Sequence, residues 1–162
     1  MRKGSDMDAF RSGNPGTPDF RVKRYPFYLL NRLVSRYNLI IEGRLRTMGL
    51  DIASWRVLMI LGERSPRPAR EIAEAAVINL STLTRILQRM AALELVTTAP
   101  SPEDGRVTLV ELTREGEEGL RDARLIASPV YEHVTRGLSP EEFEQLISLL
   151  DRLHDNLEPL VP

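Results

Sequence analysis

The segment from Asn79 to Glu94 has two chemically different faces, and this feature constrains the fold more than any other part of the chain. In a helix, side chains three and four residues apart share a face, so the apolar and polar residues of this segment separate cleanly. The apolar face consists of Leu83, Ile86, Leu87, Met90 and Leu93, and the polar face carries Ser81, Thr82, Arg85, Gln88 and Arg89. The pattern predicts a helix, capped by Asn79, that packs on a core along one side and presents polar groups along the other.

Two short helices are expected before this segment. Asp51 can cap a helix that ends at Gly62, because its side chain can accept a hydrogen bond from a free backbone N–H of the first turn. Pro68 suits the first turn of the next helix, which ends before Val77. A tight connection then leads to Asn79.

A hairpin is expected after the two-faced helix. Residues 95–99 and 107–112 have the β-branched content and the bounding turn residues of two short strands. The tip between them carries Asp104, Gly105 and Arg106. Two short helices followed by a hairpin with a charged tip is the order of elements in a winged helix-turn-helix.

Longer amphipathic helices are expected on both sides of these elements. One helix ends at Gly49, and another is capped by Thr113, although Pro129 should kink or interrupt it. The last helix opens with a capping box made by Ser139 and Glu142. The expected fold is therefore mainly α, with six helices and one small β-hairpin.

Composition excludes several classes of protein. The chain has 162 residues, which suits one globular domain, and it has no cysteine, which excludes disulfides and thiolate metal sites. No apolar run approaches the roughly 20 residues that span a bilayer, so a cytoplasmic location is expected. Residues 1–20 mix Gly, Pro, Ser and charges without periodicity, and we expect a mobile tail there.

Charge is balanced overall but is unevenly distributed. With a net charge of −1, the chain as a whole lacks the positive charge that is typical of nucleic-acid-binding domains. Binding to nucleic acid would therefore depend on the local arrangement of basic residues. Residues 21–46 hold seven basic residues and one acid, whereas residues 113–162 hold eleven acids and five arginines. These two regions are expected to attract each other.

From about residue 25 to residue 157 the sequence resembles the MarR family of winged helix-turn-helix transcription regulators. The resemblance is carried by LDIASWRVL at Leu50–Leu58, by Glu71–Ala73 and by STLTRILQRM at Ser81–Met90. Its most specific part is the wing signature within SPEDGRVTLVELTREG. That signature matches Asp104, Arg106, Leu112, Thr113 and Gly116 to the family's Asp-x-Arg followed by Leu-Thr-x-x-Gly.

The resemblance implies a DNA-binding regulator, a repressor, that binds a pseudo-palindromic operator as an intertwined homodimer. Residues 50–112 would form the DNA-binding lobe, and residues 21–49 with 113–162 the dimerisation region. The expected DNA contacts are Ser81, Thr82, Thr84, Arg85, Gln88, Arg89 and the wing residue Arg106. Arg85 is suited to guanine and Gln88 to adenine, while Asp104 and Gly105 would shape the wing.

Two departures from the family pattern lie at and just after the end of the helix Asn79–Glu94, which the resemblance identifies as the recognition helix. Glu94 stands where the family usually has glycine, so the turn needs another cap or a strained left-handed residue. Thr97–Ala99 replaces a basic residue that is common just before the wing, which removes a possible phosphate contact.

A modulating ligand, a small aromatic or other organic acid, is implied by the resemblance. Tyr28, Tyr37, Trp55 and Met59 could line its pocket, with Arg32 and Arg36 as partners for a carboxylate. For any single one of these residues, ordinary core packing is the favoured interpretation.

Other interpretations of the sequence remain open. A polar helix face is often only a solvated surface, and some winged helices act as adaptors that bind protein instead of DNA. Asp151, His154, Asp155 and Glu158 have a spacing compatible with metal, but a charged helix face is far commoner, and neither metal nor cofactor is expected. No nucleophile with a nearby base can be assembled, so an enzyme is not expected.

Overall fold

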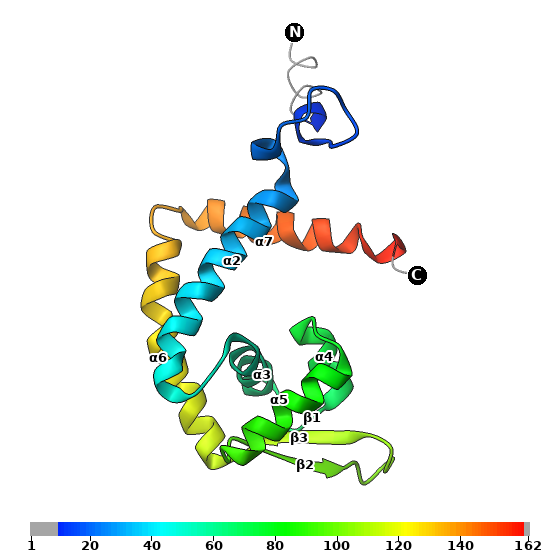
Figure 1. The fold of residues 1–162 in the computed structure, drawn as a ribbon, viewed down its shortest axis with the longest axis vertical. Helices are drawn as coiled ribbons and strands as arrows, with labels where there is room; N and C mark the ends of the chain where they lie inside the picture. Colours follow the sequence, from blue (N-terminus) through cyan, green and yellow to red (C-terminus); the bar gives the residue numbers. More distant parts are fainter. Residues whose placement is uncertain (1–9, 161–162) are drawn as a thin grey trace. The chain divides into compact units, whose positions relative to one another are not determined.

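The computed structural model describes residues 10–160, which are mostly helical with one small antiparallel sheet (Figure 1). The helices are α2 (Pro26–Leu45), α3 (Ile52–Glu63), α4 (Ala69–Ala76), α5 (Leu80–Ala92), α6 (Arg114–Val134) and α7 (Pro140–Asp155). The strands are β1 (Arg67–Pro68), β2 (Val96–Pro100) and β3 (Thr108–Leu112), in the order β1-β3-β2. The chain divides into two compact units between Ala123 and Arg124. None of the described helices is long and apolar enough to cross a membrane.

The first unit contains a winged helix-turn-helix. In Figure 1, α3, α4 and α5 gather above the sheet, and the hairpin of β2 and β3 extends beside α5. Leu58, Ile72, Leu83 and Val110 come from α3, α4, α5 and β3 respectively, and all four are fully buried. Fully burying side chains of this size contributes roughly 1.5 to 3 kcal/mol each, so their packing holds the three helices against the sheet.

Side-chain caps set the starts of the helices where the sequence predicts them. Asp51 accepts a hydrogen bond from the Ser54 backbone N–H at 2.7 Å, and Asn79 accepts one from the Thr82 N–H at 2.7 Å. Ser139 begins α7 with the expected capping box. These predictions are confirmed because capping depends only on residues within one helical turn.

Four details of the structure differ from the sequence-based prediction. Residues 10–13 are also α-helical, so the described chain has one α-helix more than the six expected. The sheet has a third strand, β1, because Arg67 and Pro68 pair with β3, and a two-residue strand has no periodicity to detect. Helix α6 continues through Pro129 to Val134, so the proline does not interrupt it. Leu93 follows the end of α5 and is half exposed, so it does not belong to the buried stripe.

The continuity of α6 has a simple physical reason. Proline removes one backbone donor, which leaves the carbonyl four residues earlier, that of Leu125, without its helical partner. Pro129 and Leu125 are both exposed, so water can satisfy that carbonyl. The flanking turns are then sufficient to carry the helix across the proline.

The segment before α2 is hydrogen-bonded from residue 11 onward. Arg11 forms an ion pair with Asp19 at 3.1 Å, and its carbonyl accepts a hydrogen bond from the Thr17 hydroxyl at 2.6 Å. The N–H of Arg21 donates to the Ser12 carbonyl at 2.9 Å. Residues 1–9 of the expected tail lie outside the described residues.

A close approach between two backbones joins the end of α5 to the start of α6. A Cβ added at Gly116 would lie 1.9 Å from the carbonyl oxygen of Leu95, so only glycine fits at this crossing. The Thr113 hydroxyl donates to the Glu94 carbonyl and accepts from the Gly116 N–H at 2.9 Å. The Leu-Thr-x-x-Gly sequence is therefore a clamp that attaches the start of α6 to the segment that follows α5.

Replacing Gly116 with alanine should destabilise the fold strongly. The added methyl group meets a backbone oxygen that cannot move independently, so Gly116→Ala is expected to cost at least about 3 kcal/mol. Gly119→Ala is the matched control, because a Cβ there meets only the tip of the Leu95 side chain at 3.3 Å. Chemical unfolding followed by circular dichroism measures both, and equal stability of the two variants would contradict the clamp.

Candidate nucleic-acid interface

The two faces of α5 lie as the sequence predicts. Its apolar face is buried, with Leu83, Ile86, Leu87 and Met90 at most 6% exposed. Its polar face is exposed at each of the six predicted positions, which are Ser81, Thr82, Thr84, Arg85, Gln88 and Arg89. The helix therefore presents hydroxyl, amide and guanidinium groups to solvent while its opposite side anchors it in the core.

The hydroxyl groups near the start of α5 have partners within the helix. Ser81 donates to the Asn79 side chain at 2.8 Å, and Thr84 donates to the Leu80 carbonyl at 2.9 Å. A hydroxyl oxygen that donates in this way keeps its lone pairs as acceptors. These side chains are thereby oriented, and they remain accessible.

The two arginines of α5 differ in their surroundings. Arg85 forms no ion pair or hydrogen bond with other described residues, so its guanidinium is free to bind an external partner. Arg89 instead donates to Asp51 Oδ2 at 2.6 Å. Burial raises the pKa of Asp51, but hydrogen bonds from Ser54 and Arg89 outweigh this effect, and the net shift of the Asp51 pKa is downward.

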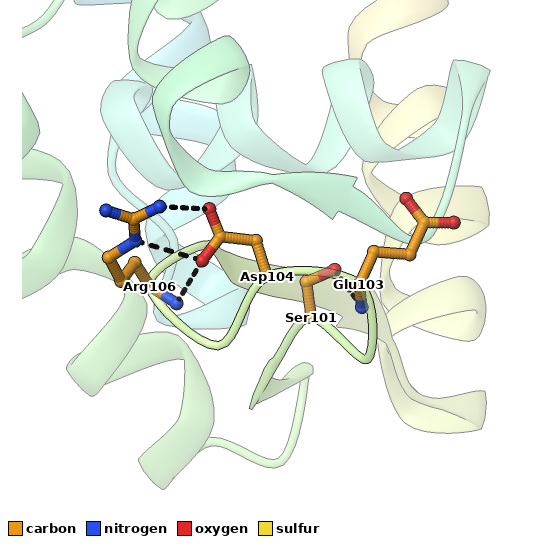
Figure 2. A network of polar contacts seen from close by, with 4 residues as sticks. All are labelled: Ser101, Glu103, Asp104 and Arg106. Carbon is orange, nitrogen blue, oxygen red and sulfur yellow. Dashed lines mark hydrogen bonds and ion pairs between the residues drawn. The ribbon is translucent and has the colours of Figure 1, made fainter.

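The tip of the hairpin is organised by one carboxylate (Figure 2). Asp104 accepts hydrogen bonds from the Arg106 backbone N–H at 3.0 Å and from its guanidinium at 3.1 and 3.3 Å. The guanidinium and backbone bonds from Arg106 lower the pKa of Asp104. The Arg106 side chain is 93% exposed and keeps one Nη without a partner among the described residues, so it can contact an anion while Asp104 holds it.

Position 105, between Asp104 and Arg106, does not require a glycine. Its φ is not positive, and an added Cβ would meet nothing within 4 Å. The structure brings Asp104 and Arg106 together, but it gives no reason for glycine between them.

A groove of about 560 Å³ lies between α5 and the hairpin. Its lining includes Leu80, Thr84 and Gln88 from α5 and Arg106 from the wing. Arg70, at the start of α4, also lines it, and sequence reasoning missed this residue because nothing local marks it as facing α5. Two residues of the polar face of α5, Thr84 and Gln88, therefore border the same groove as Arg106 of the wing.

The residues predicted to surround an effector lie on α2 and α3. The Arg32 guanidinium sits over the Tyr28 ring at 6.0 Å, and Arg36, one turn further along α2, is exposed. Tyr37 is partly buried, and this burial raises its pKa.

The two α3 residues of that set differ in exposure. Met59 is exposed, whereas Trp55 is 3% exposed, and its Nε1 has no hydrogen-bond partner among the described residues. An indole N–H that is buried without a partner costs free energy, so Trp55 is the one member of the set with an unmet bonding requirement.

Asp151, His154, Asp155 and Glu158, whose spacing in the sequence is compatible with metal, are all exposed. Within residues 10–160 there is no group of three or more His, Asp or Glu side chains that could hold a metal ion. His154 is instead 3.7 Å from Asp155 on an exposed surface of α7.

Comparison with known proteins identifies the family of this chain. Residues 48–107 match the model of the MarR family. The chain is 37% identical over 147 residues to the HTH-type transcriptional repressor IacR of Pseudomonas putida, covering 91% of this chain and 88% of that protein. The chain is a member of the MarR family. It is therefore a DNA-binding transcriptional regulator and not an enzyme.

Solved structures share the fold of this chain. A MarR-family regulator from Silicibacter pomeroyi has a TM-score of 0.78 and 26% identity, over 85% of this chain and 93% of that one. BpsR of Bordetella bronchiseptica has a TM-score of 0.74 and 24% identity, over 84% of this chain and 97% of that one. Its structure is described as showing how 6-hydroxynicotinic acid regulates the DNA binding of BpsR. The expected winged helix-turn-helix fold is confirmed.

Glu94 carries backbone strain at the exit of the recognition helix. Its φ of 58° is in the left-handed region, which favours glycine, and no described residue pairs with its side chain. Glu94→Gly should therefore raise the free energy of unfolding by about 1 kcal/mol. Glu94→Ala is the control, since it keeps the Cβ that causes the strain; a gain of the same size in both variants by chemical unfolding would show that the side chain, and not φ, is responsible.

Proposed function

We propose that this protein is a homodimeric repressor that binds a pseudo-palindromic operator through α5 and the hairpin. The observation that carries the proposal is the exposed polar face of α5, with an unpaired Arg85, beside a wing whose tip presents Arg106. A helix of this kind fits the major groove, where arginine pairs with guanine and glutamine with adenine. Since its target is the chromosome, we assign the protein to the cytoplasm.

Apolar exposure supports the homodimer. Helix α7 buries none of its residues in a single copy of the chain, although its apolar side chains form one stripe. Exposed large apolar residues include Leu33, Val34, Leu39 and Ile40 on α2 and Leu146, Ile147, Leu149 and Leu153 on α7. We assign residues 21–49 and 113–162 to dimerisation and residues 50–112 to the DNA-binding lobe, because patches of this extent mark interfaces. Twofold symmetry would then duplicate α5 for a pseudo-palindromic site.

A small organic acid is the effector that the residues of α2 and α3 favour. Arg32 and Arg36 can pair with a carboxylate, Tyr28 and Met59 are accessible, and Trp55 has an indole N–H without a partner. BpsR, a protein of the same fold, is described as regulated by such an acid. The effector would act by favouring a conformation in which the two copies of α5 no longer match the operator.

The alternative function is a winged-helix adaptor that binds another protein. It predicts that no duplex is selected from a random-sequence library and that the polar face of α5 contacts a protein surface. The unpaired guanidinium of Arg85 favours DNA, because a free cation on an exposed helix face suits a phosphate-lined groove.

Arg85 and Arg106 should have different effects on DNA binding. On the duplex that the wild type selects from a random-sequence library, Arg85→Ala is expected to cost about 1 to 3 kcal/mol, with little effect on random duplex. Arg106→Ala should weaken binding to both duplexes and reduce the salt slope by about one. Fluorescence anisotropy at several salt concentrations measures these effects; an equal loss on both duplexes for Arg85→Ala would limit that residue to phosphate.

The effector site predicts a selective loss of response. If an acid from a panel of small aromatic acids releases the wild type from the selected duplex, Arg32→Ala and Arg36→Ala should require at least about tenfold more of it, because one charge pair is lost. Arg21→Ala is the control, since Arg21 is exposed and precedes α2. The same titration by anisotropy decides the question; an unchanged response in both arginine variants would exclude this site.

A further inference from the structure

One carboxylate links the start of α3 to the last turn of α5. Asp51 Oδ1 accepts a hydrogen bond from the Ser54 N–H at 2.7 Å and so caps α3, while Asp51 Oδ2 accepts from Arg89 Nη2 at 2.6 Å. The two residues are 38 positions apart in the sequence. Among the described residues, this is the one ion pair that joins α5 to the N-cap of α3.

Both ends of α5 are flanked by a non-glycine residue in the left-handed region, Val77 with a φ of 56° and Glu94 with a φ of 58°. The N-terminal end follows α4 after a connection of three residues, 77–79. The C-terminal end is attached to α6 by the Leu-Thr-x-x-Gly clamp, which does not involve α3. The pair between Asp51 and Arg89 adds a polar contact between this end of α5 and the start of α3.

Arg89 is less free than Arg85 to bind a base. Its Nη2 is committed to a short, charge-assisted hydrogen bond with Asp51, and a bidentate contact with a base that used this nitrogen would break that bond. Arg85, one turn earlier on the same exposed face, has no such bond to break. The sequence predicts a DNA contact for both arginines. In the structure they differ, because Arg89 has an intramolecular partner and Arg85 has none among the described residues.

We infer that Arg89 is a positioning residue that holds α5 at the angle from which Arg85 and Gln88 reach bases. This inference rests on the proposed function and changes the role predicted for Arg89 from that of a DNA contact. Bidentate hydrogen bonds to a base depend steeply on angle and distance. A small rotation of α5 would therefore weaken the selected site while leaving contacts with phosphate intact.

Two single variants and their combination test the inference. Arg89→Ala removes the donor, and Asp51→Asn removes the charge while keeping an oxygen that can cap α3. Arg114→Ala is the matched control, since it removes an exposed arginine that pairs with Glu118 within α6. Circular dichroism establishes that each variant is folded, and anisotropy over a range of salt concentrations then measures binding to the selected duplex and to random duplex.

A positioning role predicts one pattern of results. Arg89→Ala and Asp51→Asn should each bind the selected duplex roughly five- to tenfold more weakly, and the double variant should be no weaker than either single variant. Binding to random duplex and the salt slope should stay at the values of the wild type and of Arg114→Ala, because no phosphate contact is lost.

Other patterns overturn the inference. If Arg89→Ala weakens binding to both duplexes and lowers the salt slope by about one, while Asp51→Asn binds as tightly as the wild type or more tightly, Arg89 is a phosphate contact. If both single variants bind like the wild type, the pair does not position α5. A wild type that binds no duplex at all would instead overturn the proposed function, and this outcome is distinct because it precedes any comparison of variants.

Discussion

The burial of one face of α5 is the interaction on which the rest of the structure depends. Because Leu83, Ile86, Leu87 and Met90 are enclosed by the core of the first unit, a rotation of the helix large enough to turn its polar face inward would expose them. The polar face is thereby committed to solvent. The same apolar packing that stabilises the lobe decides which side chains can reach DNA, so stability and function are set by one helix.

The wing and the first turn of α6 complete this arrangement. The sheet places the hairpin beside α5, and the contact between Gly116 and the Leu95 carbonyl attaches α6 where α5 ends. Asp104 then orients Arg106 at the tip. The two signatures of the wing thus have separate structural roles, since Asp-x-Arg shapes its tip and Leu-Thr-x-x-Gly fixes its base.

Local features were predictable from the sequence, and long-range ones were not. The faces of α5 and the caps at Asp51, Asn79 and Ser139 depend on residues within a turn or two, so periodicity and residue type reveal them. The pairing of β1 with β3 and the bond between Arg89 and Asp51 join distant segments, and no local pattern encodes them. For the candidate site, exposure on α5 and at the wing tip was predicted, whereas the place of Arg70 in the groove needed coordinates; the roles of these residues at DNA stay predictions.

Hydroxyl-radical footprinting of the duplex selected by the wild-type protein tests the central claim most directly. Two copies of α5 related by a twofold axis should protect two sets of backbone positions, symmetric about the centre of the site and about one helical turn apart. Protection confined to one half of the duplex would contradict the homodimer. A duplex left uniformly cleaved at saturating protein would contradict the role of α5 itself.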